Sequence, residues 1–256
     1  MEEEIIRTYD IDKKPRLLKA EEIECRVGTI NGRGCSLLLY KDARVDMKIL
    51  DETYGVGNWQ RTHEVINDNL FCTIEIWTDK INQWVKKQDV GTESYTEKEK
   101  GEASDSFKRA GFNVGIGREL YTSPFIWIQP KADMKPYNTK DVEGKEANEF
   151  YPYKKDNYGN GVYTTKTVFK VTEIGYTEDN VINRLTITDH KGNKRFLLVP
   201  VEEQEEILNL TVELNDLVRD KNYSFEKIHK HYKVESTQEM TLEQLRDAVE
   251  KLKGMK

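Results

Sequence analysis

The sequence predicts an α+β fold in which an antiparallel three-stranded meander precedes a long charged helix, followed by an added β-hairpin and a small C-terminal helical region. Apolar residues alternate from Trp59 to Val90 in three runs of about eight residues, which is typical of strands. They recur at helical spacing on either side of this stretch and again in residues 201–256. The 256 residues allow one large domain, or one domain with a small appendage.

The N-terminal segment changes character near Pro15. Residues 1–15 are charged and aperiodic, which predicts a flexible leader. Leu17, Leu18 and Ile23 then suggest a short helical entry, and the polar, glycine-bearing stretch 28–34 is typical of a loop or hairpin tip. We expect the ordered core of the protein to occupy residues 16–200.

Two helices flank the predicted meander. Asp42 is the expected N-cap of a helix that ends at Tyr54, because apolar residues recur there at helical spacing and a glycine follows. Turn-rich segments at 67–69 and 79–82 separate the three strands. A charged helix then begins near Glu97 and carries one apolar stripe. The stripe consists of Ala103, Phe107 and Ala110.

The second half of the chain contains three further segments. A polar stretch without periodicity at about 130–163 predicts an excursion loop. A hairpin with a third strand is expected at about 166–199, where alternation returns. Residues 201–256 form the predicted C-terminal helical region, whose last helix begins at a capping box made by Thr241 and Gln244.

Composition restricts the classes of function. The chain has 40 Lys and Arg against 46 Asp and Glu, so a formal charge of -6 argues against coating nucleic acid by bulk charge, and a binding surface must be a local patch. No apolar run approaches the roughly 20 residues that span a bilayer. The acidic start is unlike a secretory signal, and three cysteines without CxxC spacing indicate free thiols. We therefore expect a cytoplasmic protein.

The sequence shows no motif that predicts covalent chemistry. The four histidines lack zinc-site spacing, and the glycines at 111–117 follow a helix rather than the strand that a dinucleotide fingerprint requires. Residues 156–161 resemble a calcium loop, but Tyr158 occupies a ligand position. The chain contains no G-x-x-x-x-G-K-[ST] sequence. We expect no catalytic residue, no metal and no cofactor, and hence no enzyme.

A basic pair, Lys108 and Arg109, lies in the middle of the charged helix. One interpretation is a solvated helix face, paired with acidic residues at helical spacing. The other is a contact surface for nucleic acid. The other basic residues near this helix or upstream of it are Arg26, Arg33, Lys41, Lys98, Lys100 and Arg118.

Five segments around the meander carry a resemblance to a known family. In chain order they are Leu18–Arg26, Leu38–Arg44, Tyr54–Trp59, Asp89–Gly91 and Ser106–Gly115. Together they resemble the Rad-fifty-two/Rad-twenty-two family of DNA single-strand annealing proteins, in its shorter bacteriophage form, over about residues 16–128. The most specific pieces are the G-x-x-x-W end of the first helix and the Lys-Arg-Ala helix that follows an Asp-Val-Gly strand end.

The resemblance implies a β-β-β-α core whose sheet folds over the long helix, in protomers that join into rings or helical filaments. It also implies that single-stranded DNA lies in a basic outer groove, with phosphates held and bases turned outward. Arg26 matches a basic residue on the family's first helix, and Lys108 and Arg109 match the groove floor, whereas Phe112 stands where eukaryotic members carry another Arg. The expected DNA-binding residues are Arg26, Tyr40, Lys41, Lys98, Lys100, Lys108, Arg109 and Arg118.

The resemblance thus predicts an ATP-independent annealing protein of homologous recombination and double-strand break repair, phage-encoded and acting in a bacterial cytoplasm. The C-terminal region resembles the helical tail of phage annealing proteins, which implies docking to the host single-strand binding protein; a plain helical cap on the oligomer is the alternative. Two other functions stay open. They are a magnesium-dependent nuclease that uses Glu75 and Asp89, and a structural ring protein.

Overall fold

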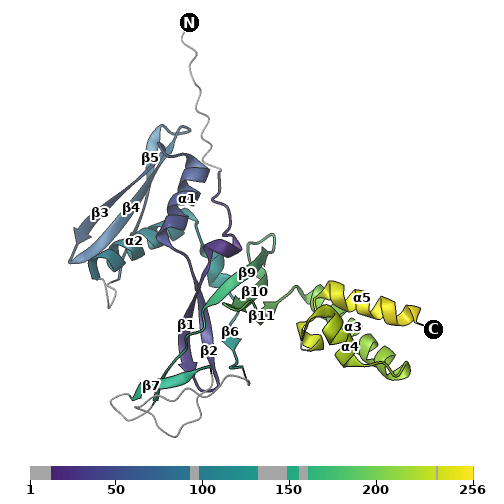
Figure 1. Ribbon diagram of the computed structural model, residues 1–256. Coiled ribbons are helices and arrows are strands. Elements are labelled where there is room, and N and C mark those ends of the chain that lie inside the picture. Colours follow the sequence, from purple (N-terminus) through teal and green to yellow (C-terminus); the bar gives the residue numbers. More distant parts are fainter. Residues whose placement is uncertain (1–12, 93–97, 132–148, 156–160, 235, 256) are drawn as a thin grey trace.

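The computed structural model describes residues 13–92, 98–131, 149–155, 161–234 and 236–255, and shows a mixed α+β protein with antiparallel sheets and several helices (Figure 1). The larger hydrophobic cluster includes Ile74, Phe107 and Leu185, and a second cluster joins the C-terminal helices around Leu214. Among the described helices, none is both long and apolar enough to cross a membrane. Most of the predicted leader lies outside the described residues.

A six-stranded antiparallel sheet contributes much of the larger cluster, with strand order β11-β10-β9-β1-β2-β6. Its strands are β1 (Glu24–Asn31), β2 (Gly34–Tyr40), β6 (Ile126–Ile128), β9 (Phe169–Tyr176), β10 (Ile182–Asp189) and β11 (Lys194–Leu198). Strand β1 pairs with β9 where Glu24 lies opposite Lys170, so the sheet joins segments that are far apart in the sequence. The predicted second hairpin with its third strand is confirmed by β9, β10 and β11.

The first hairpin of this sheet confirms the prediction only at its tip, the turn at residues 32–33 between β1 and β2. The expected helical entry is only a 3-10 turn, η1 (Ala20–Glu22), and most of the predicted loop at 28–34 belongs to strand β1. The strand register shifts near Thr29, whose N–H donates to Oγ of Ser36 at 2.9 Å. This bulge interrupts the alternation of side chains, which is why the sequence pattern did not indicate a strand.

The helix before the meander is confirmed as α1 (Ala43–Tyr54). The Asp42 side chain caps it by accepting the N–H of Arg44 at 2.8 Å, and Gly55, at a φ of 85°, ends it. Such a carboxylate satisfies a backbone donor that has no partner within the helix. The cap therefore fixes where the chain turns from β2 into α1.

The predicted meander is confirmed as a three-stranded antiparallel sheet, and helix α2 packs against it (Figure 1). The elements are β3 (Trp59–Ile66), β4 (Asn69–Thr78), β5 (Gln83–Val90) and α2 (Lys98–Val114). Phe107 of α2 is fully buried, with the Trp59 ring 6.3 Å from its centroid and the Arg61 guanidinium 4.5 Å from it. The apolar stripe of α2 thus faces the sheet and leaves the basic pair Lys108–Arg109 beside this contact.

The predicted excursion at 130–163 is wrong in its second part. Strands β7 (Tyr151–Lys155) and β8 (Gly161–Thr164) pair there as a two-stranded antiparallel sheet. The strands are short and β8 is only half-buried, so the hairpin leaves no alternation of apolar and polar residues for a pattern to detect. Residues 132–148 and 156–160 of this region lie outside the described part of the chain.

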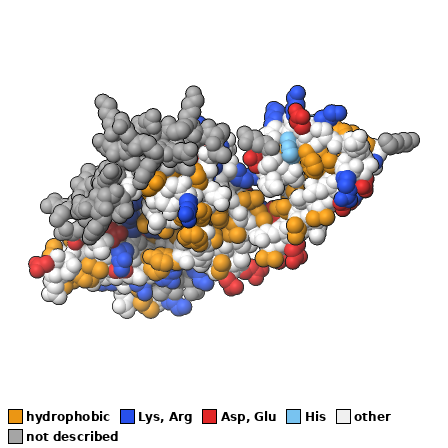
Figure 2. All heavy atoms as spheres, turned by 90° about the horizontal axis from the view of Figure 1, so that it is seen from below, with side chains coloured by type: hydrophobic (Ala, Val, Ile, Leu, Met, Phe, Trp, Pro, Cys, Tyr) orange, Lys and Arg blue, Asp and Glu red, His pale blue; other side chains and the backbone are white. Residues whose placement is uncertain are grey.

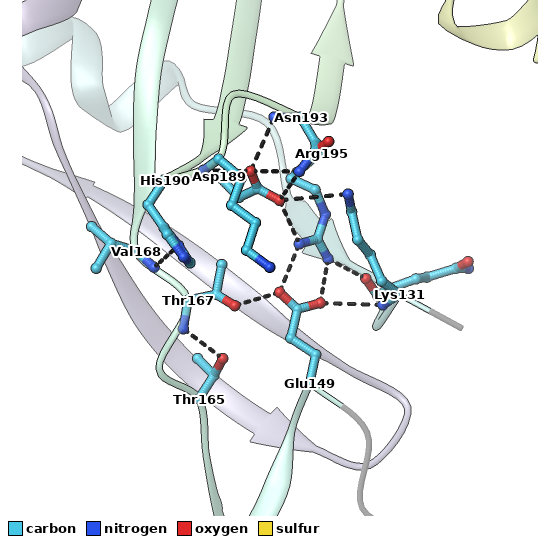
Figure 3. A network of polar contacts seen from close by, with 11 residues as sticks. Lys131, Glu149, Thr165, Thr167, Val168, Asp189, His190, Asn193 and Arg195 are labelled. Atoms are coloured by element: carbon cyan, nitrogen blue, oxygen red, sulfur yellow. Dashed lines mark hydrogen bonds and ion pairs between the residues drawn. The ribbon is translucent and has the colours of Figure 1, made fainter. Parts of the chain in front are cut away.

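A buried polar network ties together the two edge strands of the six-stranded sheet (Figure 3). Arg195 of β11 is 4% exposed and donates to both carboxylate oxygens of Glu149 at 2.7 Å, and to the Gln129 carbonyl after β6 at 2.7 Å. Burial alone would raise the pKa of Glu149, but its bonds with Arg195 and Thr167 outweigh burial and lower that pKa. The bidentate pair therefore stays ionised and holds the edges of the sheet together.

The C-terminal helices form a lobe beside the sheets (Figure 1). They are α3 (Val201–Asp220), α4 (Phe225–Tyr232) and α5 (Leu242–Gly254), with a 3-10 turn, η3 (Thr237–Glu239), between the last two. The predicted capping box is confirmed, since Thr241 Oγ1 accepts the N–H of Gln244 at 3.2 Å and the Gln244 side chain accepts the N–H of Thr241 at 2.9 Å. An ion pair between Arg184 of β10 and Glu203 of α3 connects the lobe to the sheet.

Candidate nucleic-acid groove

An open groove of about 770 Å³ lies between the second half of α2 and the paired strands β2 and β6. One side carries Lys108 and Arg109 from α2, and Asp89 from the end of β5. The other side is formed by Tyr40 of β2, with further residues from the 3-10 helix η2 (Arg118–Thr122) and the start of β6. The structure thus places the predicted basic pair at a concave surface rather than on a flat helix face.

The two basic residues differ in their environment. The side chain of Arg109 is 48% exposed, and its Nε lies 3.2 Å from Oδ1 of Asp89. Lys108 is half-buried and has no hydrogen bond or ion pair within the described residues. The other groove carboxylate, Asp105, accepts bonds from the backbone and hydroxyl of Thr92 at 3.1 and 3.0 Å. Lys108 is therefore a cation that an anionic ligand can neutralise.

Lys41 also lines the groove, but its charge belongs to a buried ion pair. Its side chain is 8% exposed and bonds to Oδ1 of Asp46, which is fully buried in α1. Burial lowers the pKa of Lys41 and raises the pKa of Asp46 to about 6, while the attraction between the two groups opposes both shifts. Gly117, at a φ of 76°, packs so closely on Lys41 that a Cβ there would lie 2.4 Å from Cε. Lys41 therefore compensates the charge of Asp46, and its expected contact with DNA stays a prediction.

Arg26 is a further cation next to the groove, where its guanidinium lies over the ring of Tyr40. Arg26 lies on strand β1 rather than on a helix, which corrects the placement implied by the resemblance. Its guanidinium carbon lies 4.8 Å from the centre of the Tyr40 ring, and one of its nitrogens lies 3.1 Å from Glu24. Because the Arg26 side chain is 55% exposed, it remains accessible to a ligand.

The Arg118 side chain caps the C-terminal end of α2. Its guanidinium donates to the carbonyl of Phe112 at 2.8 Å and to that of Asn113 at 3.0 Å. These bonds place positive charge at the negative end of the helix dipole, close to the groove. Lys98 and Lys100 belong to the first turn of α2, and their side chains lie outside the described part of the structure.

Two exposed aromatic residues in the groove were missed from the sequence. Tyr121 of η2 is 80% exposed and Phe125, next to β6, is 77% exposed, and both line the groove. Figure 2 shows that hydrophobic side chains also gather in exposed patches on the face seen from below, with single Lys and Arg side chains between them. The sequence offered only a local signal, an aromatic residue on each side of Pro124. The fold is what brings both rings to the groove, where the Tyr121 ring lies 4.8 Å from that of Phe112 of α2.

The carboxylates of the nuclease hypothesis do not converge. Glu75 and Asp89 lie on opposite faces of the meander, because Cys72 is paired with Asp89 and Glu75 is three residues further along β4. Glu75 bonds instead to Lys86 of β5 and Gln60 of β3. Among the residues that the structure describes, no group of three His, Cys, Asp or Glu could hold a metal ion. The geometry therefore offers this pair no shared metal.

The cysteines are free thiols, as predicted. Burial raises the pKa of Cys25 to about 12 and those of Cys35 and Cys72 to about 11, so the reactive thiolate form is disfavoured.

Comparison with known proteins finds no family that matches the chain and no curated protein that matches it.

Proposed function

We propose that this chain is an ATP-independent protein that binds and anneals single-stranded DNA in homologous recombination and double-strand break repair. In this proposal it is phage-encoded and acts in the cytoplasm of a bacterial host. It binds as a ring or filament of identical protomers, and its C-terminal lobe docks the host single-strand binding protein or caps the oligomer. The meander with α2 against it supports the proposal, because a β-β-β-α core is what the resemblance implies.

The observation that carries the proposal is the groove containing Lys108 and Arg109. Annealing needs a strand to be captured without regard to sequence, which contacts between cations and phosphates provide. The basic pair lies on a helix anchored by the buried Phe107, so the backbone that carries both cations is held against the sheet. A single protomer offers few such contacts, but repetition of the groove around an oligomer makes binding multivalent.

The net charge of -6 is compatible with this proposal because charge is unevenly distributed. Helix α3 carries several acidic residues, including Glu202 and Glu203 in its first turn, and belongs to the C-terminal lobe rather than to the groove. A negative lobe disfavours indiscriminate binding to nucleic acid. The local cations can still bind the phosphates of a strand, and the affinity for DNA must fall strongly as the salt concentration rises.

Annealing of two complementary, fluorescently labelled oligonucleotides without ATP tests the proposal. We expect the wild-type protein to accelerate pairing, and a Lys108→Ala/Arg109→Ala variant to remain folded by circular dichroism and lose the acceleration. The matched control is Lys227→Ala/Lys230→Ala on α4, which removes the same charge from the exposed surface of the C-terminal lobe.

Normal annealing by the groove variant would contradict the site assignment. An equal loss in the control, with an oligomeric state in sedimentation equal to that of the wild type, would mean that bulk charge, rather than the groove, binds DNA. Cleavage of the labelled strands on addition of magnesium would favour the nuclease alternative instead.

A further inference from the structure

The groove that contains the basic pair is also lined by exposed aromatic residues. They are Tyr121 and Phe125, and roughly four-fifths of each residue remains exposed. Exposed apolar surface in a groove often marks a contact with a ligand or another macromolecule. The question is therefore which ligand fits both aromatic rings and cations in one groove.

Both rings are held in place by their neighbours. The centre of the Tyr121 ring lies 4.8 Å from that of Phe112, and the Phe125 ring is stacked on Trp127 with centroids 6.2 Å apart and planes 19° apart. The backbone around them is also fixed, because Thr122 accepts the N–H of Ile182 of β10 through its Oγ1 at 2.9 Å. Rings held in this way lose little conformational entropy when a ligand stacks on them.

We propose that Tyr121 and Phe125 form a stacking wall for the nucleobases of the strand whose phosphates contact Lys108 and Arg109. This inference rests on the proposed function and adds a contact to the bases. Stacking on aromatic rings is tolerant of sequence, because every base has a π-face. It uses the faces of the bases and leaves their Watson–Crick edges free, so a stacked strand can still meet its complement.

A single strand fits this groove better than a second copy of the chain does. A dry interface between protomers would bury Lys108, which has no ion-pair partner among the described residues, and an unpaired buried charge is costly. A nucleic-acid strand instead supplies one phosphate for each base. It can therefore neutralise the cations on α2 while its bases contact the rings of Tyr121 and Phe125.

The test compares the binding of oligo-dT with that of an abasic sugar–phosphate oligonucleotide of the same length. We expect wild-type protein to bind oligo-dT at least about fivefold more tightly, since stacking on an aromatic side chain contributes at least that much per base. A Tyr121→Ala/Phe125→Ala variant should lose this preference and bind the abasic oligonucleotide as the wild type does. Tyr121→Trp, which keeps a ring, should retain the preference.

The salt dependence separates the contribution of the two aromatic residues from that of the basic pair. The aromatic variant should keep the wild-type slope of log K against log salt, because that slope counts phosphate contacts, whereas Lys108→Ala/Arg109→Ala should lower it. A full dT preference in the aromatic variant would overturn the inference. If the Tyr121→Ala/Phe125→Ala variant keeps the dT preference but differs from the wild type in oligomeric state by sedimentation, the two residues belong to a protomer interface and the inference is overturned.

The inference and the proposed function can fail separately. If wild-type protein binds dT and abasic oligonucleotides equally, with a strong salt dependence that needs Lys108 and Arg109, only the stacking wall is refuted. If it binds neither oligonucleotide, the proposed function fails and the stacking wall fails with it.

Discussion

Replacing Asp46 with asparagine tests the buried ion pair that Asp46 forms with Lys41 of the groove. In the wild type, Asp46 is fully buried and Lys41 is 8% exposed, so each charge depends on the other. Within the described residues, Oδ2 of Asp46 has no hydrogen-bond partner, which leaves Lys41 as the main compensation for this carboxylate. The asparagine side chain is close in shape to that of aspartate, so Asp46→Asn changes charge with little change in packing.

The expected loss of stability has an upper limit. Removing one partner of a buried pair typically costs about 3–5 kcal/mol. The variant can also release the proton of Lys41, and for a lysine of ordinary pKa about 10.4 this costs about 4.6 kcal/mol at pH 7 and about 2 kcal/mol at pH 9. We therefore expect the free energy of unfolding to fall by about 3–4.6 kcal/mol at pH 7 and by no more than about 2 kcal/mol at pH 9.

The sign of this pH dependence follows from burial, which already lowers the pKa of Lys41 in the wild type. Without Asp46 that pKa falls further, so the folded variant binds fewer protons than the unfolded chain and gains stability as pH rises. Urea unfolding of wild type, Asp46→Asn and Lys41→Met/Asp46→Asn at pH 7 and 9 measures the effect. The double variant should be more stable than the single one at pH 7. A destabilisation by Asp46→Asn that is equal at both pH values would refute the reasoning.

Three further predictions concern stability. Glu149→Ala should lower the free energy of unfolding by about 3–5 kcal/mol in urea titrations, because it leaves the buried guanidinium of Arg195 without its carboxylate. Thr241→Ala removes the capping box of α5 and should cost about 1 kcal/mol in the same titration; no change would mean that the cap is dispensable. Gly111→Ala should lower Tm, because a Cβ there would lie 2.3 Å from Oδ1 of the buried Asp46, and an unchanged Tm would show that the two helices can separate without loss.

Local signals predicted much of the fold. The cap at Asp42 and the stop at Gly55 give both ends of α1, and turns at 67–69 and 79–82 separate three alternating strands. The spacing of the apolar residues in α2 predicted which face of this helix is buried. Each of these elements is recognisable within a window of about 10–20 residues.

The missed features depend on contacts that are distant in the sequence. Strand β1 contains Gly28 and a bulge, and it is completed by pairing with β2 and β9 rather than by its own pattern. The resemblance singled out Lys108 and Arg109 among the basic residues, but the sequence could not show that the charge of Lys41 is buried against Asp46. Burial and pairing of that kind become visible only in three dimensions.

The salt dependence of oligo-dT binding tests most directly the claim that the groove holds phosphates. Fluorescence anisotropy at a series of salt concentrations gives the slope of log K against log salt for the wild type and for Lys108→Ala/Arg109→Ala. If both side chains contact a phosphate, the slope of the variant should be shallower by about 1.4, at about 0.7 per phosphate of a single strand. Identical slopes for the two proteins would contradict the assignment of the groove as the DNA site.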